Sequence, residues 1–276
     1  QVHVLDWEGK VHAPFPLTVP AGIQSPLEVS LLEHPVVYAL WVSGRDQRMY
    51  GYDQEGRLLS GWGPNQAVDT VQPFAIQHAQ YERQDYITAL SESGDLYLFD
   101  RLGRLKVEAL PLRTEAISPP YLRTGPKQQR IAVGQSDGYV QVFNLEGQTF
   151  RLSLMPNHRG DVQFQFEDMV GDARNDYLMW DTSSLRLFSY EGTDFREVQS
   201  WSVGTPLHSV QYAERQGEGV LLGFSAIARR LWALRMDGKV QPGFPVAADA
   251  SAAVLSEGER LLMLCYYEGS LYLYEF

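Results

Sequence analysis

One short pattern recurs along the whole chain and constrains its fold more than any other feature. Each copy is an apolar run followed by a polar residue, two further residues and a glycine, as in Leu96–Gly103. The apolar run has the composition of a β-strand. Asp or Asn shortly before glycine is typical of a hairpin turn, because glycine tolerates a positive φ and the polar side chain can bond its own backbone. The pattern therefore predicts a strand and a tight turn in every copy.

The copies follow one another at a nearly constant interval. Their turn glycines are 44 to 47 residues apart, at Gly9, Gly56, Gly103, Gly147, Gly192 and Gly238. A steady period over most of a chain indicates a repeat architecture. Each interval contains three or four short β-type runs and no helical periodicity, which matches a four-stranded propeller blade. We therefore predict an all-β fold in which residues 1–276 form a single β-propeller domain.

The intervals also predict how the ring closes. The 276 residues hold six repeats at this interval, which correspond to six four-stranded antiparallel blades. The N-terminal run Val2–Asp6 and the C-terminal run Leu271–Phe276 lack partners of their own, so pairing them in one shared blade would remove an open sheet edge. A seven-bladed ring is the alternative, if the two runs are third strands of different blades.

A second motif allows a resemblance to be named. Gly9–Pro16 and Gly238–Pro245 both read Gly-Lys-Val followed by Phe-Pro. A strand, a turn with Gly-Lys and then Phe-Pro resemble the repeats of the FG-GAP and quinoprotein-like β-propellers, which are common in bacterial surface and periplasmic proteins. The resemblance implies the fold and an extracytoplasmic location, in the periplasm or at the cell surface. It implies no activity, because one fold serves many functions.

Composition excludes some classes of function. The formal charge of −11 argues against nucleic acid as a partner, because a phosphate-binding surface needs clustered Lys and Arg. No apolar stretch reaches the roughly 18 residues of a transmembrane helix. The single cysteine, Cys265, lies in an apolar run and is predicted to be a packed thiol. Because the chain begins at Gln1 rather than Met, we expect a processed piece of a larger protein.

One loop carries a candidate metal site. Asp168, Asp172 and Asp176 match three positions of the calcium loop Asp-x-Asp-x-Asp-Gly-x-x-Asp that FG-GAP-type blades carry. Val170 replaces a ligand and Ala173 replaces the turn glycine. Calcium takes about six to eight oxygen ligands, so these losses predict a weak site or a turn that no longer binds an ion. No other cofactor is expected.

A ring of polar positions is the candidate partner surface. They recur once per blade where the first strand begins, and are Ser25, Gln72, Ser118, Asp161, Thr205 and Ser251. We expect them to surround the mouth of the central channel, or alternatively only to satisfy backbone groups. His78 and His208 occupy similar places on first strands and are predicted to be polar lining.

The motifs that the chain lacks shape the functional prediction. It contains no Gly-x-Ser-x-Gly elbow, no phosphate loop, no His-Glu-x-x-His and no quinone-docking pattern. We therefore predict that the chain is not an enzyme. We expect a binding or scaffold propeller that contacts another protein or another domain of its parent chain. The alternative is a carbohydrate-binding or carbohydrate-active propeller, because aromatic residues and carboxylates are abundant. A third possibility is a structural spacer.

Overall fold

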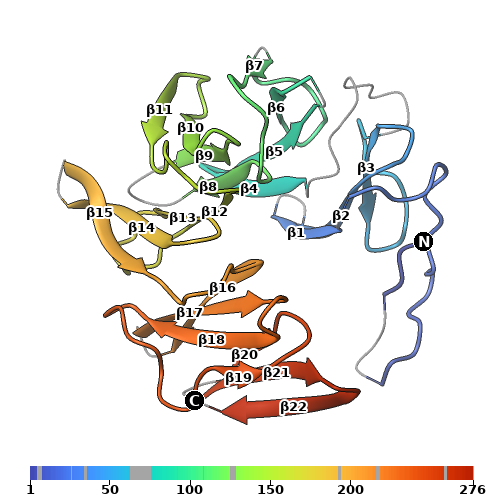
Figure 1. Cartoon of the computed structure of the whole chain (residues 1–276). Helices are drawn as coiled ribbons and strands as arrows, with labels where there is room; N and C mark the ends of the chain where they lie inside the picture. The colour runs from blue at the N-terminus through green and yellow to red at the C-terminus, as the bar shows by residue number, and fades with distance from the viewer. Residues whose placement is uncertain are drawn as a thin grey trace. The chain divides into compact units, whose positions relative to one another are not determined.

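The computed structural model describes residues 1–4, 8–25, 27–33, 36–62, 76–91, 93–107, 109–124, 129–191, 194–215, 218–257 and 260–275. These residues form six antiparallel sheets of three or four strands and contain no helix (Figure 1). The all-β prediction is confirmed. In this part of the chain no helix is long and apolar enough to cross a membrane. The chain divides into two compact units, residues 1–153 and 154–276, which are described separately.

The first unit contains three sheets. The first sheet consists of β1 (Glu28–Glu33), β2 (Val36–Ser43) and β3 (Met49–Asp53). The second consists of β4 (Gln77–Tyr81), β5 (Gln84–Leu90), β6 (Asp95–Phe99) and β7 (Leu110–Pro111). The third consists of β8 (Tyr121–Thr124), β9 (Gln129–Gly134), β10 (Tyr139–Phe143) and β11 (Thr149–Ser153). In each sheet the strands lie side by side in chain order.

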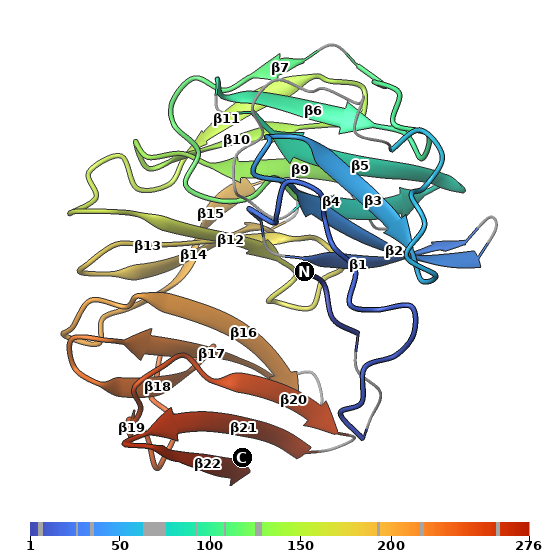
Figure 2. The same cartoon turned by 90° about the vertical axis from the view of Figure 1, so that its right-hand side faces the viewer.

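The second unit repeats this arrangement. The fourth sheet consists of β12 (Gln163–Glu167), β13 (Asp176–Trp180), β14 (Leu185–Glu191) and β15 (Asp194–Trp201). The fifth consists of β16 (Ser209–Arg215), β17 (Glu218–Ser225), β18 (Arg230–Arg235) and β19 (Val246–Ala247). The sixth consists of β20 (Ala253–Glu257), β21 (Arg260–Tyr267) and β22 (Ser270–Glu275). Figure 2 shows the fifth and sixth sheets stacked within this unit.

The apolar run of the copy Leu96–Gly103 is observed as β6 (Asp95–Phe99), the third strand of its sheet. In the first, second and fifth sheets the outer segment begins with an isolated bridge, between Tyr52 and Leu58, Phe99 and Leu105, and Leu234 and Val240. In the second and fifth sheets this segment pairs again farther along, as the two-residue strands β7 and β19. In the first sheet the backbone instead turns at Gly61, whose φ is +84°.

Successive side chains of a strand point to opposite faces of its sheet, and in the second sheet apolar side chains on both faces belong to the core. Trp41 of the first sheet is fully buried against Ile87 of the second, and Trp62 packs edge-on against Trp41 with ring centroids 4.9 Å apart. The opposite face of the second sheet packs against the third through Leu96 and Ile131. The second sheet is thus covered on both faces, which explains why its second strand, β5, is buried almost along its whole length.

The N-terminal segment covers part of the first sheet. Val2 and Leu17 form an isolated bridge, and Val2, Phe15 and Val19 pack on the half of the sheet formed by the end of β2 and by β3. The strand predicted over Val2–Asp6 is thus reduced to this bridge, and its last two residues lie outside the described ones. Within the described ranges no pairing between the chain ends is found. Six blades and a closed ring are not observed directly.

Candidate binding sites

The predicted calcium loop is held together by its own backbone. Both carboxylate oxygens of Asp168 accept backbone N–H groups, from Gly171 at 2.8 Å and from Ala173 at 2.9 Å. Asp172 Oδ1 accepts the N–H of Arg174 at 2.8 Å. In the residues that the structure describes, no three His, Cys, Asp or Glu side chains are grouped to hold a metal ion. The aspartates therefore act here as turn-forming side chains, and calcium binding stays a prediction.

Asp176 is the most unusual member of the loop because it is fully buried at the start of β13. Its Oδ2 accepts the N–H groups of Met169 at 2.7 Å and Val170 at 2.9 Å, whereas its Oδ1 has no hydrogen-bond partner. Burial raises the pKa of this carboxyl to about 6, although the Ser189 hydroxyl and the two N–H groups partly offset the effect. The side chain ties the loop to the sheet at a cost in electrostatic free energy.

Two members of the predicted polar ring are buried. The Ser25 hydroxyl accepts the backbone N–H of Ser43 at 2.9 Å, and the Ser118 hydroxyl accepts that of Gly134 at 3.0 Å. Ser25 is 5% exposed and Ser118 is 2% exposed. These serines join the segment before the first strand to the end of the second strand, and they offer no surface to a partner.

The remaining ring positions differ from one another. Thr205 forms a hydroxyl–hydroxyl hydrogen bond of 3.0 Å with Ser225 at the end of β17. Asp161 and Ser251 are exposed. Gln72 lies outside the described residues. The ring therefore remains a prediction as a binding surface, but the place where Thr205 meets Ser225 leads to a better defined candidate.

An apolar turn lies beside Thr205, between β17 and β18. Its tip is Ala226-Ile227-Ala228, and the Ile227 side chain is 72% exposed. Three consecutive apolar residues are unexpected at an exposed turn, where Gly, Asn, Asp, Ser and Pro dominate. Two side chains fix the backbone of this turn. Ser225 Oγ accepts the N–H of Ala228 at 3.2 Å, and His208 Nδ1 accepts the N–H of Ala226 at 3.1 Å.

A charged cluster braces the same turn against the sixth sheet. Arg229 Nε donates to Asp249 Oδ1 at 2.6 Å, and its guanidinium lies over the ring of Tyr267, 5.0 Å from the centroid. Asp249 Oδ2 also accepts the N–H of Glu268 at 2.8 Å. The hydrogen bond from Arg229 lowers the pKa of Asp249, so this carboxyl stays ionised. Ile227, Arg229 and Tyr267 thus form what we call the apolar turn site, with Asp249 and Glu268 at its border.

A buried charged group in the first unit could not be predicted from the sequence. His78 Nε2 lies 2.9 Å from Asp85 Oδ1, and both side chains are only 6% exposed. Arg101 lies 3.8 Å from the same carboxylate. On the neighbouring strand β1, burial raises the pKa of Glu28, while His78 and Arg123 counteract the shift. A carboxylate of this kind orients an imidazole and can prepare it for proton transfer. Only the register between β4 and β5 reveals the pair.

The tryptophans are placed as core residues. All five with described positions are buried: Trp41, Trp62, Trp180, Trp201 and Trp232. An exposed tryptophan beside convergent carboxylates would have favoured sugar binding, and these five do not provide one.

The fold resembles solved β-propellers. One similar structure is BBS1N in complex with ARL6DN, at 18% identity over 78% of this chain and 67% of that chain, with a TM-score of 0.57. A second is virginiamycin B lyase from Staphylococcus aureus with quinupristin, at 13% identity over 94% of this chain and 86% of that chain, with a TM-score of 0.61. Another is the dihydro-heme d1 dehydrogenase NirN, at 14% identity, 99% of this chain, 58% of that chain and a TM-score of 0.64. No protein-family model and no curated protein matches the sequence. The likenesses show a propeller-like fold, and the FG-GAP resemblance stays an interpretation.

The comparisons correct one prediction. We predicted from the missing motifs that the chain is not an enzyme. The lyase and the dehydrogenase are enzymes with similar folds, at 13% and 14% identity. This finding overturns the prediction, because the same fold also serves enzymes.

Proposed function

We propose that the protein is a β-propeller that binds another protein through the apolar turn site. The observation that carries this proposal is the 72% exposed Ile227 at the tip of a turn whose backbone is held by Ser225 and His208. A preformed turn loses little conformational entropy when a partner covers it. Arginine, tyrosine and large apolar side chains surrounded by polar residues have the composition of a binding hot spot. BBS1N, a fold neighbour, is also found in a complex with another protein.

The partner surface is expected to be apolar at its centre and basic at its edge. Asp249 and Glu268 border the site, and the chain as a whole carries a formal charge of −11. A positively charged partner would be attracted to this surface and would associate faster at low ionic strength. We retain the extracytoplasmic location as part of the proposal.

We further propose that the six sheets close into a six-bladed ring. Two bare apolar faces support this closure. On the first sheet Val29, Leu31, Val36 and Tyr38 share one face and are 43–69% exposed. On the sixth sheet Leu264, Tyr266, Leu271 and Leu273 share one face and are 39–68% exposed. Faces of this size are rarely left in water. In the proposed ring these faces cover each other, and β22 lies beside the N-terminal segment.

A photo-crosslinking experiment tests the binding function. Benzoylphenylalanine at position 226 reports on anything that contacts the turn, and the same amino acid at Leu105 (53% exposed) serves as the control. Irradiation of cells that produce the protein naturally should give one discrete adduct from position 226 and none of the same mass from position 105. Adding Ile227→Asp to the first variant should remove that adduct. Equal adducts at both positions, or an adduct that survives Ile227→Asp, would overturn the proposal.

A further inference from the structure

The second unit contains a cavity of about 540 Å³ between the fourth and fifth sheets. Its walls carry apolar side chains from both sheets, from the loop before β13 and from β21: Met169, Leu187, Val198, Val220, Met236 and Leu261. A volume of this size lies within the roughly 300–1,000 Å³ that small-molecule sites occupy. The cavity is separate from the apolar turn site, because β17 begins at the cavity with Glu218 and ends at the turn with Ser225.

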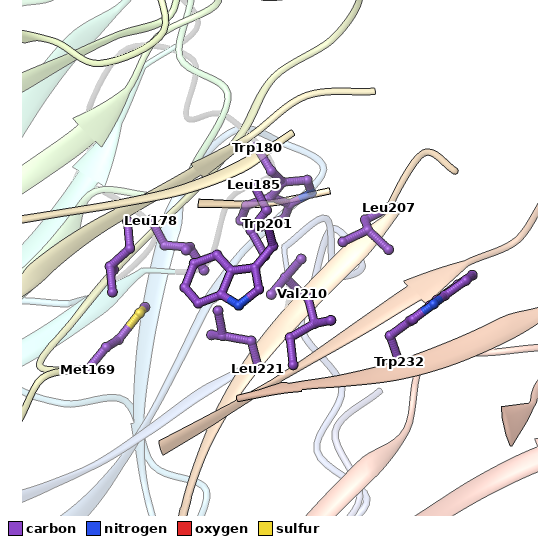
Figure 3. Close-up of a cluster of buried hydrophobic side chains, with 11 residues drawn as sticks. Met169, Leu178, Trp180, Leu185, Trp201, Leu207, Val210, Leu221 and Trp232 are labelled. Carbon is purple, nitrogen blue, oxygen red and sulfur yellow. The ribbon is translucent and has the colours of Figure 1, made fainter. Parts of the chain in front are cut away.

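The cavity stays open for a local reason. Towards the interior, Trp201, Leu178 and Leu221 fill the space between these two sheets (Figure 3). The Trp201 indole N–H donates to the carbonyl of Arg235 at 3.0 Å and so fixes the end of β18. Farther out, the register of β14 and β15 shifts between Leu187 and Phe188. A bulge increases strand twist, and Val198, the β15 residue that this shift leaves without a partner in the ladder, lines the cavity.

On the side of the fifth sheet, the cavity is lined by a glycine. Gly219 lines the cavity without a side chain, and a Cβ built there would lie 2.6 Å from the ring of Tyr212. Tyr212 therefore fixes the identity of this residue. Its hydroxyl donates to the carbonyl of Met169 at 3.4 Å, which attaches the loop before β13 to the fifth sheet. The cavity is thus bounded by a bulge on one side and by an obligatory glycine on the other.

Charged side chains of both signs lie at the edge of the cavity. Glu218 and Asp237 line it, and Asp237 lies 3.3 Å from Arg235 and 3.4 Å from Lys239. The pKa of the adjoining Tyr212 is raised to about 12, first by burial and then by four carboxylates that include Glu214 and Asp168. Asp237 is already paired with two cations, so the carboxylates that favour positive charge here are Glu218 and those around Tyr212.

We propose that this cavity binds a small amphipathic cation, with an apolar body against the methionine and aliphatic walls and an ammonium or guanidinium group beside Glu218. The flexible thioethers of Met169 and Met236 adapt to irregular apolar shapes. The exposed carboxylate of Glu218 attracts the cationic end without a large desolvation cost. The site does not depend on the protein-binding function.

Two probes with the same apolar body test the proposal. The cation 1-naphthylmethylammonium and the anion 1-naphthalenemethanesulfonate differ only in their charged group, and calorimetric titration gives both affinities. We expect the cation to bind one to one and the anion to bind at least about fivefold more weakly. Glu218→Gln should weaken the cation by about two- to fivefold and leave neutral 1-naphthalenemethanol unchanged.

A cavity-filling variant locates the site. Val198→Trp places a bulky ring in the cavity and should abolish saturable binding, whereas Val240→Trp, at an exposed position on the same unit, should not. Equal affinities for the two charged probes would overturn the proposal, and so would unchanged binding to a folded Val198→Trp variant. If Val198→Trp does not fold, Glu218→Gln decides, because the Glu218 side chain is exposed and its replacement should change the free energy of unfolding by no more than about 0.5 kcal/mol.

Discussion

Replacing Asp176 by Asn should stabilise the protein at neutral pH. The pKa of this buried carboxyl rises from 3.8 to about 6 on folding, so the native state favours the protonated form. Because a tenfold change in proton affinity corresponds to about 1.4 kcal/mol, this rise in pKa corresponds to roughly 3 kcal/mol. The folded chain holds a proton that the unfolded chain has lost between about pH 4 and pH 6. The free energy of unfolding contributed by this group therefore falls as the pH rises through that window.

Asparagine imitates the protonated acid at this position. Its amide oxygen can accept the same N–H groups of Met169 and Val170, while its amide N–H group has no partner in place of Oδ1. We therefore expect a gain of about 1–3 kcal/mol at pH 7.5, less than the full electrostatic cost because a buried polar group is left unpaired. For a chain of this size the gain corresponds to about 3–10 °C in Tm.

Urea titrations at pH 4, 5, 6 and 7.5, followed by tryptophan fluorescence, measure the effect. The difference in unfolding free energy between Asp176→Asn and the parent should be largest at pH 7.5 and should decline towards pH 4. Taking this difference cancels the titration of the other carboxylates. Asp161→Asn, at an exposed position, is the control and should stay within about 0.5 kcal/mol at every pH. A difference that does not change with pH, or a destabilised variant at pH 7.5, would refute the reasoning.

Three further predictions follow from the contacts. In thermal unfolding, Gly61→Ala should lower the free energy of unfolding by roughly 1–3 kcal/mol more than Gly171→Ala does. Both glycines have a positive φ, but only at Gly61 would the new Cβ lie 2.0 Å from the Leu102 carbonyl oxygen. Equal losses of stability in the two variants would contradict this prediction. Ser118→Ala should cost roughly 1–3 kcal/mol because it leaves the buried N–H of Gly134 unpaired, and a neutral result would show that another group replaces the hydroxyl. Millimolar calcium should leave Tm unchanged, because backbone N–H groups occupy the loop carboxylates, and a rise reversed by chelator would restore the predicted metal site.

The strands could be predicted because their pattern is local. Short apolar runs and Asp-x-x-Gly turns depend on neighbouring residues, and β6 is observed where the copy Leu96–Gly103 predicts a strand. The length of the outer strands could not be predicted. An isolated bridge and a strand differ only in how many residues continue the hydrogen-bonded pairing, and the sequence pattern does not show this number.

The candidate sites were harder to predict because they depend on contacts across sheets. His78 and Asp85 are seven residues apart, and only the β4–β5 register brings them to 2.9 Å. The turn that exposes Ile227 is held by a hydrogen bond from the backbone N–H of Ala226 to His208 Nδ1, and these two residues are 18 apart in the sequence. One signal was available in the sequence, since Ala226-Ile227-Ala228 lacks the residues that a turn normally selects.

Ring closure is the claim on which the architecture rests, and cross-linking across the two bare faces tests it most directly. A variant with Tyr38→Cys and Leu271→Cys places one thiol on each face, and the native Cys265 is only 1% exposed and should not react. Treatment with a short bismaleimide at low protein concentration should yield a monomer whose two new cysteines are joined, whereas neither single variant should. If the double variant gives only dimers, or no cross-link at all, the first and sixth sheets do not close the ring.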